Sequence, residues 1–154
     1  MSGVSIIESP VGRVAAHSDG SALVRVRFLG PDERVPTTPP DAISREAADQ
    51  LHAYFSGDLR VFVLKLAPKG TPFQQDVWRA LQTVPYGATT TYADIAERVG
   101  RPTAIRAVGA ANGANPIAIV IPCHRIIGRD GTLTGYAGGL DRKRVLLDLE
   151  ARAR

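Results

Sequence analysis

Five consecutive aliphatic residues, 117–121, lie between Pro116 and Pro122, and the only cysteine of the chain follows directly. An unbroken run of this kind is typical of a strand or another buried segment that is covered on both faces. Pro122 ends the run because its nitrogen offers no backbone donor. We therefore expect Cys123 at the rim of a rigid element.

The residues after Cys123 favour reactive chemistry. His124 and Arg125 would place the thiol in a positive field, which favours the nucleophilic thiolate. Consecutive side chains of a strand point to opposite faces, so His124 could assist Cys123 only across a bend or through a bridging water. The alternative is a lone cysteine that serves as a small buried apolar residue, and composition alone leaves both interpretations open.

Length and cysteine content limit the possible architectures. A chain of 154 residues can bury one sizeable core or divide into a small domain and a larger one. The first ten residues lack a basic start followed by an apolar block, so we expect no signal peptide and no membrane span. A single cysteine excludes an internal disulfide and a cysteine-rich zinc site, which favours a reducing, cytoplasmic setting.

The excess of positive charge lies in the half of the chain that contains Cys123. Residues 1–70 hold 8 Lys/Arg and 8 Asp/Glu, whereas residues 71–154 hold 11 and 7, which accounts for the whole net charge of +4. A basic half is suited to a polyanionic partner, although an ordinary solvated surface could carry the same charge.

Residues 1–69 are predicted to form a small scaffold without chemistry of its own. Asp41 is a suitable N-cap for a helix that runs to about Phe55, and residues 61–66 have the pattern of a further strand. His17 and His52 stand alone and are interpreted as surface or packing residues. Three segments alternate between turn signals and predict short antiparallel strands: 5–9, 12–17 and 21–28.

Residues 70–154 are predicted to be mainly helical. Thr71 and Gln74 form a capping box at the start of one helix, with Pro72 in its first position. Thr91 caps a second helix, 92–99, and a tight glycine turn separates it from a third, 103–111. Two short helices joined in this way have the layout of a helix-turn-helix.

The third of these helices consists largely of alanine and glycine, with Arg106 in its middle. Small residues allow a helix to approach another surface closely. That surface could be another helix of the protein interior, or a nucleic-acid groove in which Arg106 reaches between the strands and backbone amides meet phosphates.

The segment after Cys123 carries five glycines between residues 127 and 140, around the single aromatic Tyr136. It lacks the glycine-lysine-serine/threonine signature of a phosphate loop. It is either a mobile loop that presents Tyr136 to the thiol or a plain connection. A last helix from about Asp141 should face inward through Val145, Leu146 and Leu149, and Glu150 is solvated unless this helix packs beside the cysteine.

Taken together, the motifs of residues 70–152 resemble those of the O6-alkylguanine-DNA alkyltransferases, also called methylated-DNA-protein-cysteine methyltransferases, of the stand-alone bacterial type. Their order and spacing make the resemblance specific. The motifs are Gly70-Thr71-Pro72-Phe73-Gln74-Gln75-Asp76-Val77-Trp78, Val84-Pro85-Tyr86-Gly87, Arg106-Ala107-Val108-Gly109, Asn115-Pro116-Ile117, Pro122-Cys123-His124-Arg125, Leu133-Thr134-Gly135-Tyr136-Ala137-Gly138-Gly139 and Leu146-Leu147-Asp148-Leu149-Glu150.

The resemblance implies a catalytic role for four residues. Cys123 is expected to accept the alkyl group, and His124 to take the thiol proton through a bridging water. Glu150 is expected to orient His124, and Asn115 to brace the active-site turn. These roles follow the general logic of a nucleophile, a base and an orienting carboxylate.

The resemblance also implies how damaged DNA is bound. Tyr92 is expected to rotate the damaged nucleotide at its 3′ phosphate, and Arg106 to fill the space left in the base stack. Thr103, Ala107 and Gly109 would lie on the same DNA-binding helix, which in the family enters the minor groove. The wall of the guanine pocket is expected from Tyr136 together with backbone groups of Ile126 and Ala137.

The implied fold is α+β. A small N-terminal α/β domain of ribonuclease H-like type, residues 1–69, would precede a mainly α-helical domain, residues 70–154, with a helix-turn-helix of winged-helix type. The implied function is one-time transfer of the methyl group from O6-methylguanine, and from O4-methylthymine, in double-stranded DNA. No cofactor and no metal are expected, and the protein should be a monomer.

Two features depart from the family pattern, and two other functions stay open. Ile105 stands before Arg106 where a small residue is common, and the N-terminal region matches only loosely. One alternative is a helix-turn-helix or lesion-binding protein without transfer activity, although such lesion-binding relatives lack the acceptor cysteine. The other is a cysteine hydrolase that uses Cys123, His124 and Glu150 and turns over repeatedly.

Overall fold

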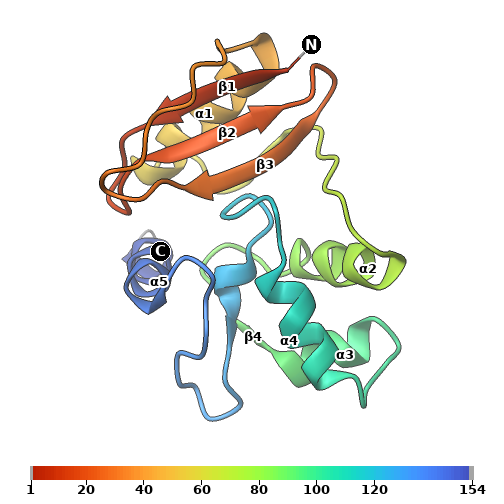
Figure 1. Ribbon diagram of the computed structural model, residues 1–154. Coiled ribbons are helices and arrows are strands. Elements are labelled where there is room, and N and C mark those ends of the chain that lie inside the picture. Colours follow the sequence, from red (N-terminus) through yellow and green to blue (C-terminus); the bar gives the residue numbers. More distant parts are fainter. Residues whose placement is uncertain (1, 153–154) are drawn as a thin grey trace. The chain divides into compact units, whose positions relative to one another are not determined.

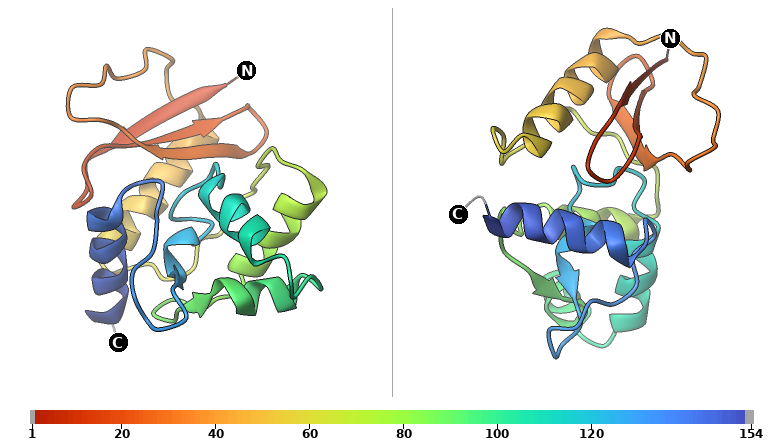
Figure 2. Two further views of the ribbon diagram at one scale, coloured as in Figure 1. Left: turned by 60° about the horizontal axis from the view of Figure 1, so that its bottom comes forward. Right: turned by 90° about the vertical axis from the view of Figure 1, so that its left-hand side faces the viewer.

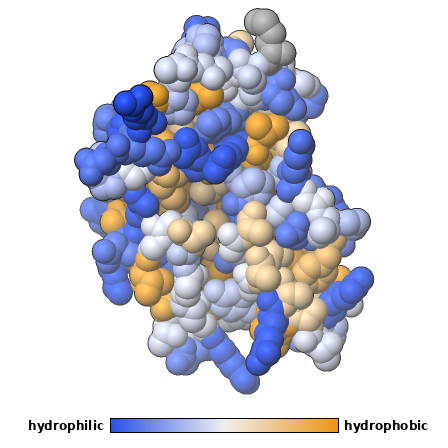
Figure 3. All heavy atoms as spheres, in the orientation of Figure 1, coloured by the Kyte–Doolittle hydropathy of each residue, from blue (hydrophilic) through white to orange (hydrophobic). Residues whose placement is uncertain are grey.

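The computed structural model describes residues 2–152 (Figure 1). By its contacts the chain divides into two compact units, the first ending at Pro68 and the second beginning at Lys69. The described residues include no helix with the length and apolar character needed to cross a membrane. On the face seen in Figure 3, apolar residues lie in small groups among hydrophilic ones.

The first unit contains a three-stranded antiparallel sheet. Its strands follow the chain order, β1 (Gly3–Ile7), β2 (Val14–Ser18) and β3 (Leu23–Phe28). The three predicted strands are confirmed, with bounds shifted by a few residues. An irregularity in the pairing of β2 with β3 lies between His17 and Ser18.

Helix α1 (Ala42–Phe55) covers one face of this sheet, as Figure 2 shows. The carboxylate of Asp41 accepts a hydrogen bond from the backbone N–H of Ser44 at 2.8 Å, which confirms the predicted N-cap. The hydroxyl groups of Ser5 in β1 and Ser44 in α1 are 2.9 Å apart and join the two elements. A Cβ at Gly3 would collide with Asp41, so β1 requires glycine at this point of close approach.

The strand predicted at residues 61–66 is wrong. Only an isolated parallel bridge forms there, between Leu23 and Leu66. The side-chain amide of Gln50 in α1 bonds both backbone groups of Val63, donating to its carbonyl at 3.0 Å and accepting from its N–H at 2.9 Å. Gln50 therefore satisfies polar groups that a neighbouring strand would otherwise pair with.

The second unit is mainly helical, and its predicted helices are confirmed to within two residues at most ends. Thr71 and Gln74 form the expected capping box. Trp78 is buried, and its indole N–H donates to the carbonyl of Ala111 at 2.8 Å, which ties the first helix of the unit to the third. The helices are α2 (Pro72–Leu81), α3 (Tyr92–Arg98), α4 (Ile105–Gly113) and α5 (Leu140–Arg152). The predicted α+β fold class is thus confirmed.

Helices α3 and α4 form the helix-turn-helix. Gly100 takes a φ of 75° after α3, where glycine adopts the left-handed conformation readily. The predicted start of α4 at Thr103 is two residues too early, because the helix begins at Ile105. Val108 and Ala111 are buried against the unit, whereas Arg106 and Ala107 are exposed, so one face of α4 packs inward and the other faces solvent.

Candidate active site

The segment that leads to Cys123 is buried but is not a strand. Residues 118–120 form a turn, across which the N–H of Ile121 donates to the carbonyl of Ile117 at 3.0 Å. The side chain of Asn115 accepts from the N–H of Ile117 at 3.0 Å and donates to the carbonyl of Ile121 at 2.8 Å. The side chain of Asn115 thus forms hydrogen bonds with backbone groups that would pair with a neighbouring strand if this segment were extended. These bonds explain why the aliphatic run did not form a strand.

Ile119, within this turn, has a φ of 71°. The left-handed region is unfavourable for a β-branched residue and costs on the order of 1–2 kcal/mol. Ile119 is buried, and the hydrogen bonds of Asn115 hold the backbone on either side of it. The active-site turn is therefore strained, and its strain is balanced by the buried surroundings.

Cys123, His124 and Arg125 form a single turn of 3-10 helix, η1 (Cys123–Arg125). Successive side chains of such a turn project about 120° apart, whereas those of a strand project in opposite directions. The turn supplies the bend that cooperation between Cys123 and His124 would require. Strand β5 (Ile126–Ile127) follows and pairs in parallel with β4 (Thr90–Thr91).

His124 and Glu150 form a buried pair. Nε2 of His124 and Oε2 of Glu150 are 2.7 Å apart, and both side chains are almost fully excluded from solvent. Burial lowers the pKa of His124 and keeps the ring neutral. Because the carboxylate accepts the Nε2 proton, Nδ1 carries the lone pair, and Nδ1 has no hydrogen-bond partner among the residues described.

Arg125 also binds Glu150, a role that the sequence did not reveal. Its Nε donates to Oε1 at 2.8 Å and its Nη2 to Oε2 at 3.0 Å, while Nη1 donates to the carbonyl of Val84 at 2.8 Å. Burial raises the pKa of Glu150, but the hydrogen bonds from His124 and Arg125 outweigh it and hold the pKa at about 2. Glu150 is therefore ionised, and it neutralises Arg125.

The thiol of Cys123 does not have the low pKa expected from its basic neighbours. The residue is only 5% exposed, and burial raises the pKa of the thiol. The nearby side chains of Asn115 and Tyr136 and the charge of Lys143 offset this only in part. The expectation was wrong because Arg125 is neutralised by Glu150 and His124 is uncharged, so the resting thiol keeps its proton.

Lys143 is a second site residue that the sequence did not reveal. It is fully buried in α5, where its Nζ donates to the carbonyl of Thr134 at 3.1 Å. Burial lowers the pKa of Lys143, and the nearby Cys123 opposes this. The predicted inward face of Val145, Leu146 and Leu149 is wrong in part, since the fully buried positions of α5 are Lys143, Leu146 and Glu150. Their spacing of three and four residues was the available signal.

The residues expected to form the pocket wall have different environments. The hydroxyl of Tyr136 lies against the thiol of Cys123, and burial raises the pKa of Tyr136 well above its usual value. Ile126 is buried in β5, whereas Ala137 is exposed. The structure therefore brings Tyr136, but not the side chain of Ala137, to the sulfur.

The residues expected to meet DNA lie on the helix-turn-helix. Tyr92 begins α3, and a Cβ at Gly109 of α4 would lie 3.8 Å from its ring, so the two positions are neighbours. The hydroxyl of Tyr92 is 2.8 Å from Oγ1 of Thr134. Three of the expected residues are exposed on α4 or just before it: Thr103, Arg106 and Ala107.

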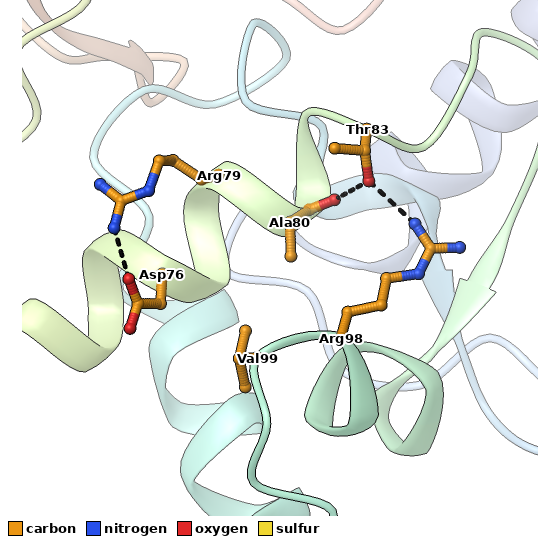
Figure 4. A pocket seen from close by; sticks show the side chains of 6 residues that line it. All are labelled: Asp76, Arg79, Ala80, Thr83, Arg98 and Val99. Carbon is orange, nitrogen blue, oxygen red and sulfur yellow. Dashed lines mark hydrogen bonds and ion pairs between the residues drawn. The ribbon is translucent and has the colours of Figure 1, made fainter.

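Within the described chain, neither a metal site nor a surface hollow between α2 and α3 offers comparable chemistry. Residues 2–152 contain no group of three His, Cys, Asp or Glu side chains that could hold a metal ion. A shallow hollow between α2 and α3 is lined by charged residues, but Arg79 pairs there with Asp76, and Arg98 donates a hydrogen bond to Thr83 at 2.8 Å (Figure 4). Arg98 also pairs with Asp94 at 3.1 Å. These pairs neutralise the hollow, which contains no nucleophile.

The sequence is similar to known DNA-repair proteins. Residues 72–152 match the family described as the DNA-binding domain of 6-O-methylguanine DNA methyltransferase. A methylated-DNA–protein-cysteine methyltransferase of Methanosarcina barkeri is 55% identical over 150 residues, which cover 94% of each chain. A protein of the same name from Mycobacterium bovis is 51% identical over 147 residues, covering 94% of this chain and 89% of that protein.

Solved structures show the same similarity. A crystal structure of Mycobacterium tuberculosis O6-methylguanine methyltransferase has a TM-score of 0.89 and 48% identity, covering all of this chain and 95% of that one. A crystal structure of the M. tuberculosis protein in complex with DNA has a TM-score of 0.87 and 51% identity, covering 96% and 92% of the two chains.

Proposed function

The chain belongs to the 6-O-methylguanine DNA methyltransferase family, and from this membership we propose that Cys123 is the residue that accepts the methyl group. The activity is transfer of the methyl group of O6-methylguanine in DNA to a protein cysteine, which repairs the DNA by direct reversal. Cys123 is the only cysteine in the sequence. The observation that carries the proposal is the buried His124–Glu150 pair directly beside this cysteine.

The resting charges define the first step. The thiol is protonated, His124 is neutral and Glu150 is ionised, so Nδ1 of His124 can receive the thiol proton through a bridging water. Glu150 then stabilises the imidazolium that forms, and Asn115 and Tyr136 stabilise the thiolate. Deprotonation is thus a step of the reaction, because the resting thiol keeps its proton.

The thiolate then attacks the carbon attached to guanine O6. A carbon–sulfur bond forms, the carbon–oxygen bond breaks, and its electron pair stays on the guanine, which becomes neutral by taking up a proton in place of the one that His124 received. The methyl group arrives on the DNA, so the transfer requires no cofactor. The thioether is stable and no nearby group can cleave it, so each molecule acts once. The same displacement would apply to O4-methylthymine and to larger alkyl groups that the pocket admits.

The substrate is double-stranded DNA, from which the damaged nucleotide must be flipped. A thiol cannot reach a base inside the duplex, and flipping costs roughly a few kcal/mol. The small exposed face of α4 is suited to a groove of the DNA, with Thr103, Ala107 and Gly109 near the DNA backbone. Arg106 would fill the space left in the base stack, and Tyr92 would crowd the 3′ phosphate. Backbone groups of Ile126 and Ala137 would complete the guanine pocket around Tyr136.

We assign these roles to residues 70–154 and a scaffold role to residues 1–69, because residues 2–69, the part of this region that the structure describes, carry no comparable cluster of reactive side chains. Nucleophile, base and orienting carboxylate all come from one chain, which favours action as a monomer. A free acceptor thiol must stay reduced, which favours a cytoplasmic location.

Incubation with duplex DNA that carries O6-methylguanine tests the proposal. Intact-mass measurement should show a gain of a single methyl group per protein molecule, located on Cys123 by peptide mapping. Product should scale with the amount of protein added and then stop. Binding without a mass gain would indicate a lesion-binding protein, and continued turnover would indicate a hydrolase.

Replacing Arg106 with alanine should slow repair of duplex DNA by roughly tenfold or more, because the vacated stack is no longer filled and the flipping cost is a few kcal/mol. Transfer from free O6-methylguanine base should be unchanged, since this substrate needs no flipping. Single-turnover rates at saturating protein measure both. Arg101→Ala, which removes the same charge from the neighbouring turn, is the control and should mainly weaken binding. Equal losses on both substrates would refute the flipping role.

A further inference from the structure

Thr134 joins three parts of the second unit. Its Oγ1 is 2.8 Å from the hydroxyl of Tyr92, at the start of α3. Its carbonyl accepts a hydrogen bond from Nζ of the buried Lys143 in α5 at 3.1 Å. It also precedes Tyr136, whose hydroxyl lies against the thiol, by only two residues. Thr134 therefore stands between the residue proposed to rotate the nucleotide and the groups around the sulfur.

Both branches of the Thr134 side chain are in contact with the protein. A Cβ built on Gly128 would come within 3.1 Å of Cγ2 of Thr134, so the methyl group packs closely over that glycine. The N–H of Gly128 in turn donates to the carbonyl of Thr132 at 2.8 Å and closes the loop beneath it. The methyl contact fixes the rotamer of Thr134 and so directs Oγ1 toward Tyr92.

Tyr92 is held at both ends of its ring. One ring edge, Cδ1 and Cε1, lies beside Gly109 of α4, where the missing side chain leaves room for it. At the other end, the hydroxyl is bonded to Thr134. Moving the ring away from this position requires loss of the hydrogen bond, so the bond fixes the conformation of Tyr92 before DNA arrives.

We propose that Thr134 is a positioning residue for nucleotide flipping, whose hydroxyl holds Tyr92 in the conformation that meets the DNA backbone. The inference rests on the role proposed for Tyr92. Thr134 would thus have two separate functions. Its side chain positions Tyr92, while its backbone carbonyl accepts the hydrogen bond of Lys143 near the thiol. A change of the side chain should therefore affect flipping and leave the transfer chemistry intact.

Thr134→Val tests this, because valine keeps the shape and both methyl-sized branches but removes the hydroxyl. Loss of a single hydrogen bond that positions the ring should slow single-turnover repair of O6-methylguanine in duplex DNA by about three- to tenfold. The rate with free O6-methylguanine base should be unchanged. Thr134→Ser, which restores the hydroxyl but not the methyl group that fixes its rotamer, should recover part of the duplex rate, and equal urea unfolding midpoints would show that both variants are folded.

A double-mutant cycle with Tyr92→Phe establishes whether the two hydroxyl groups act together. If they do, the double variant should lose no more rate on duplex DNA than either single variant. Additive losses, an unchanged duplex rate in Thr134→Val, or equal losses on duplex and free base would each overturn the proposal.

Failure of the underlying function has a different signature. If the unaltered protein gains no methyl group from duplex DNA, the proposed function itself fails. If it gains the methyl group and Tyr92→Ala is slow only on duplex DNA, while Thr134→Val matches the unaltered protein, the role of Tyr92 stands and that of Thr134 is refuted.

Discussion

Cys123→Ala is expected to abolish methyl uptake and to leave DNA affinity nearly unchanged. The side chain is buried at the start of η1, and the exposed face of α4 that is proposed to meet DNA does not include it. Alanine removes only the sulfur, and the chain contains no second thiol that could replace it. Intact mass after incubation with methylated duplex DNA measures transfer, and fluorescence anisotropy at a fixed salt concentration measures binding.

Cys123→Ser provides a matched control because its hydroxyl can keep the hydrogen bonds of Asn115 and Tyr136 with far weaker nucleophilicity. We expect this variant to bind DNA and to accept no methyl group on the timescale of the thiol. Methyl uptake by the alanine variant would show that another residue is the acceptor. A large loss of DNA affinity in both variants would show that Cys123 has a binding role that the structure does not suggest.

Local hydrogen bonds explain which elements could be predicted. The starts of α1 and α2 depend on Asp41 and on the pair Thr71 and Gln74, each within three residues of its partner, so the sequence contains the whole interaction. The same holds for the turn at Gly100, where a left-handed residue is needed. The residues around Cys123 were located by their motif, which fixes their order but not their contacts.

The errors arise where a distant or unexpected partner decides the structure. Gln50 satisfies the backbone of Val63 from 13 residues away, so the strand predicted at residues 61–66 did not form. Asn115 satisfies the backbone on either side of Ile119, so residues 117–121 are the buried segment that the pattern also allowed and not a strand. The low thiol pKa was predicted from Arg125 as a neighbour in sequence. The charge of Arg125 is instead neutralised by Glu150, 25 residues further along the chain. This pair depends on the packing of α5 and could not be seen from neighbouring residues.

Glu150 is the residue on which most of the site converges. Its carboxylate accepts hydrogen bonds from His124, from two nitrogens of Arg125 and from the N–H of Gly87 at 3.3 Å. A buried arginine that loses its partner is left with an uncompensated charge, at a cost of roughly 3–5 kcal/mol. The same carboxylate also sets which nitrogen of His124 bears the proton.

Glu150→Gln is therefore expected to lower the free energy of unfolding by roughly 3–5 kcal/mol and the rate of methyl transfer by about 100-fold or more. The amide of glutamine can donate to Nε2 of His124, which would move the ring proton to Nδ1 and remove the base. Urea unfolding and single-turnover transfer from free O6-methylguanine base measure the two effects. Asp148→Asn, an exposed change on the same helix, should leave both unchanged. A glutamine variant that keeps full activity would refute the role of Glu150 as the orienting group.

The pH dependence of stability gives an independent check on Glu150. Its pKa is about 2 in the folded protein, against an ordinary value of 4.5. A carboxylate with a lowered pKa contributes stability above its unfolded pKa, and this contribution, on the order of 3 kcal/mol, is lost as the pH falls from about 4.5 toward 2. His124, whose pKa is lowered by burial, adds a loss that begins higher, below about 6.5. Urea unfolding between pH 7 and pH 3 should therefore fall more steeply below pH 4.5 in the unaltered protein than in Glu150→Gln, and parallel curves would contradict the ionised, bonded carboxylate.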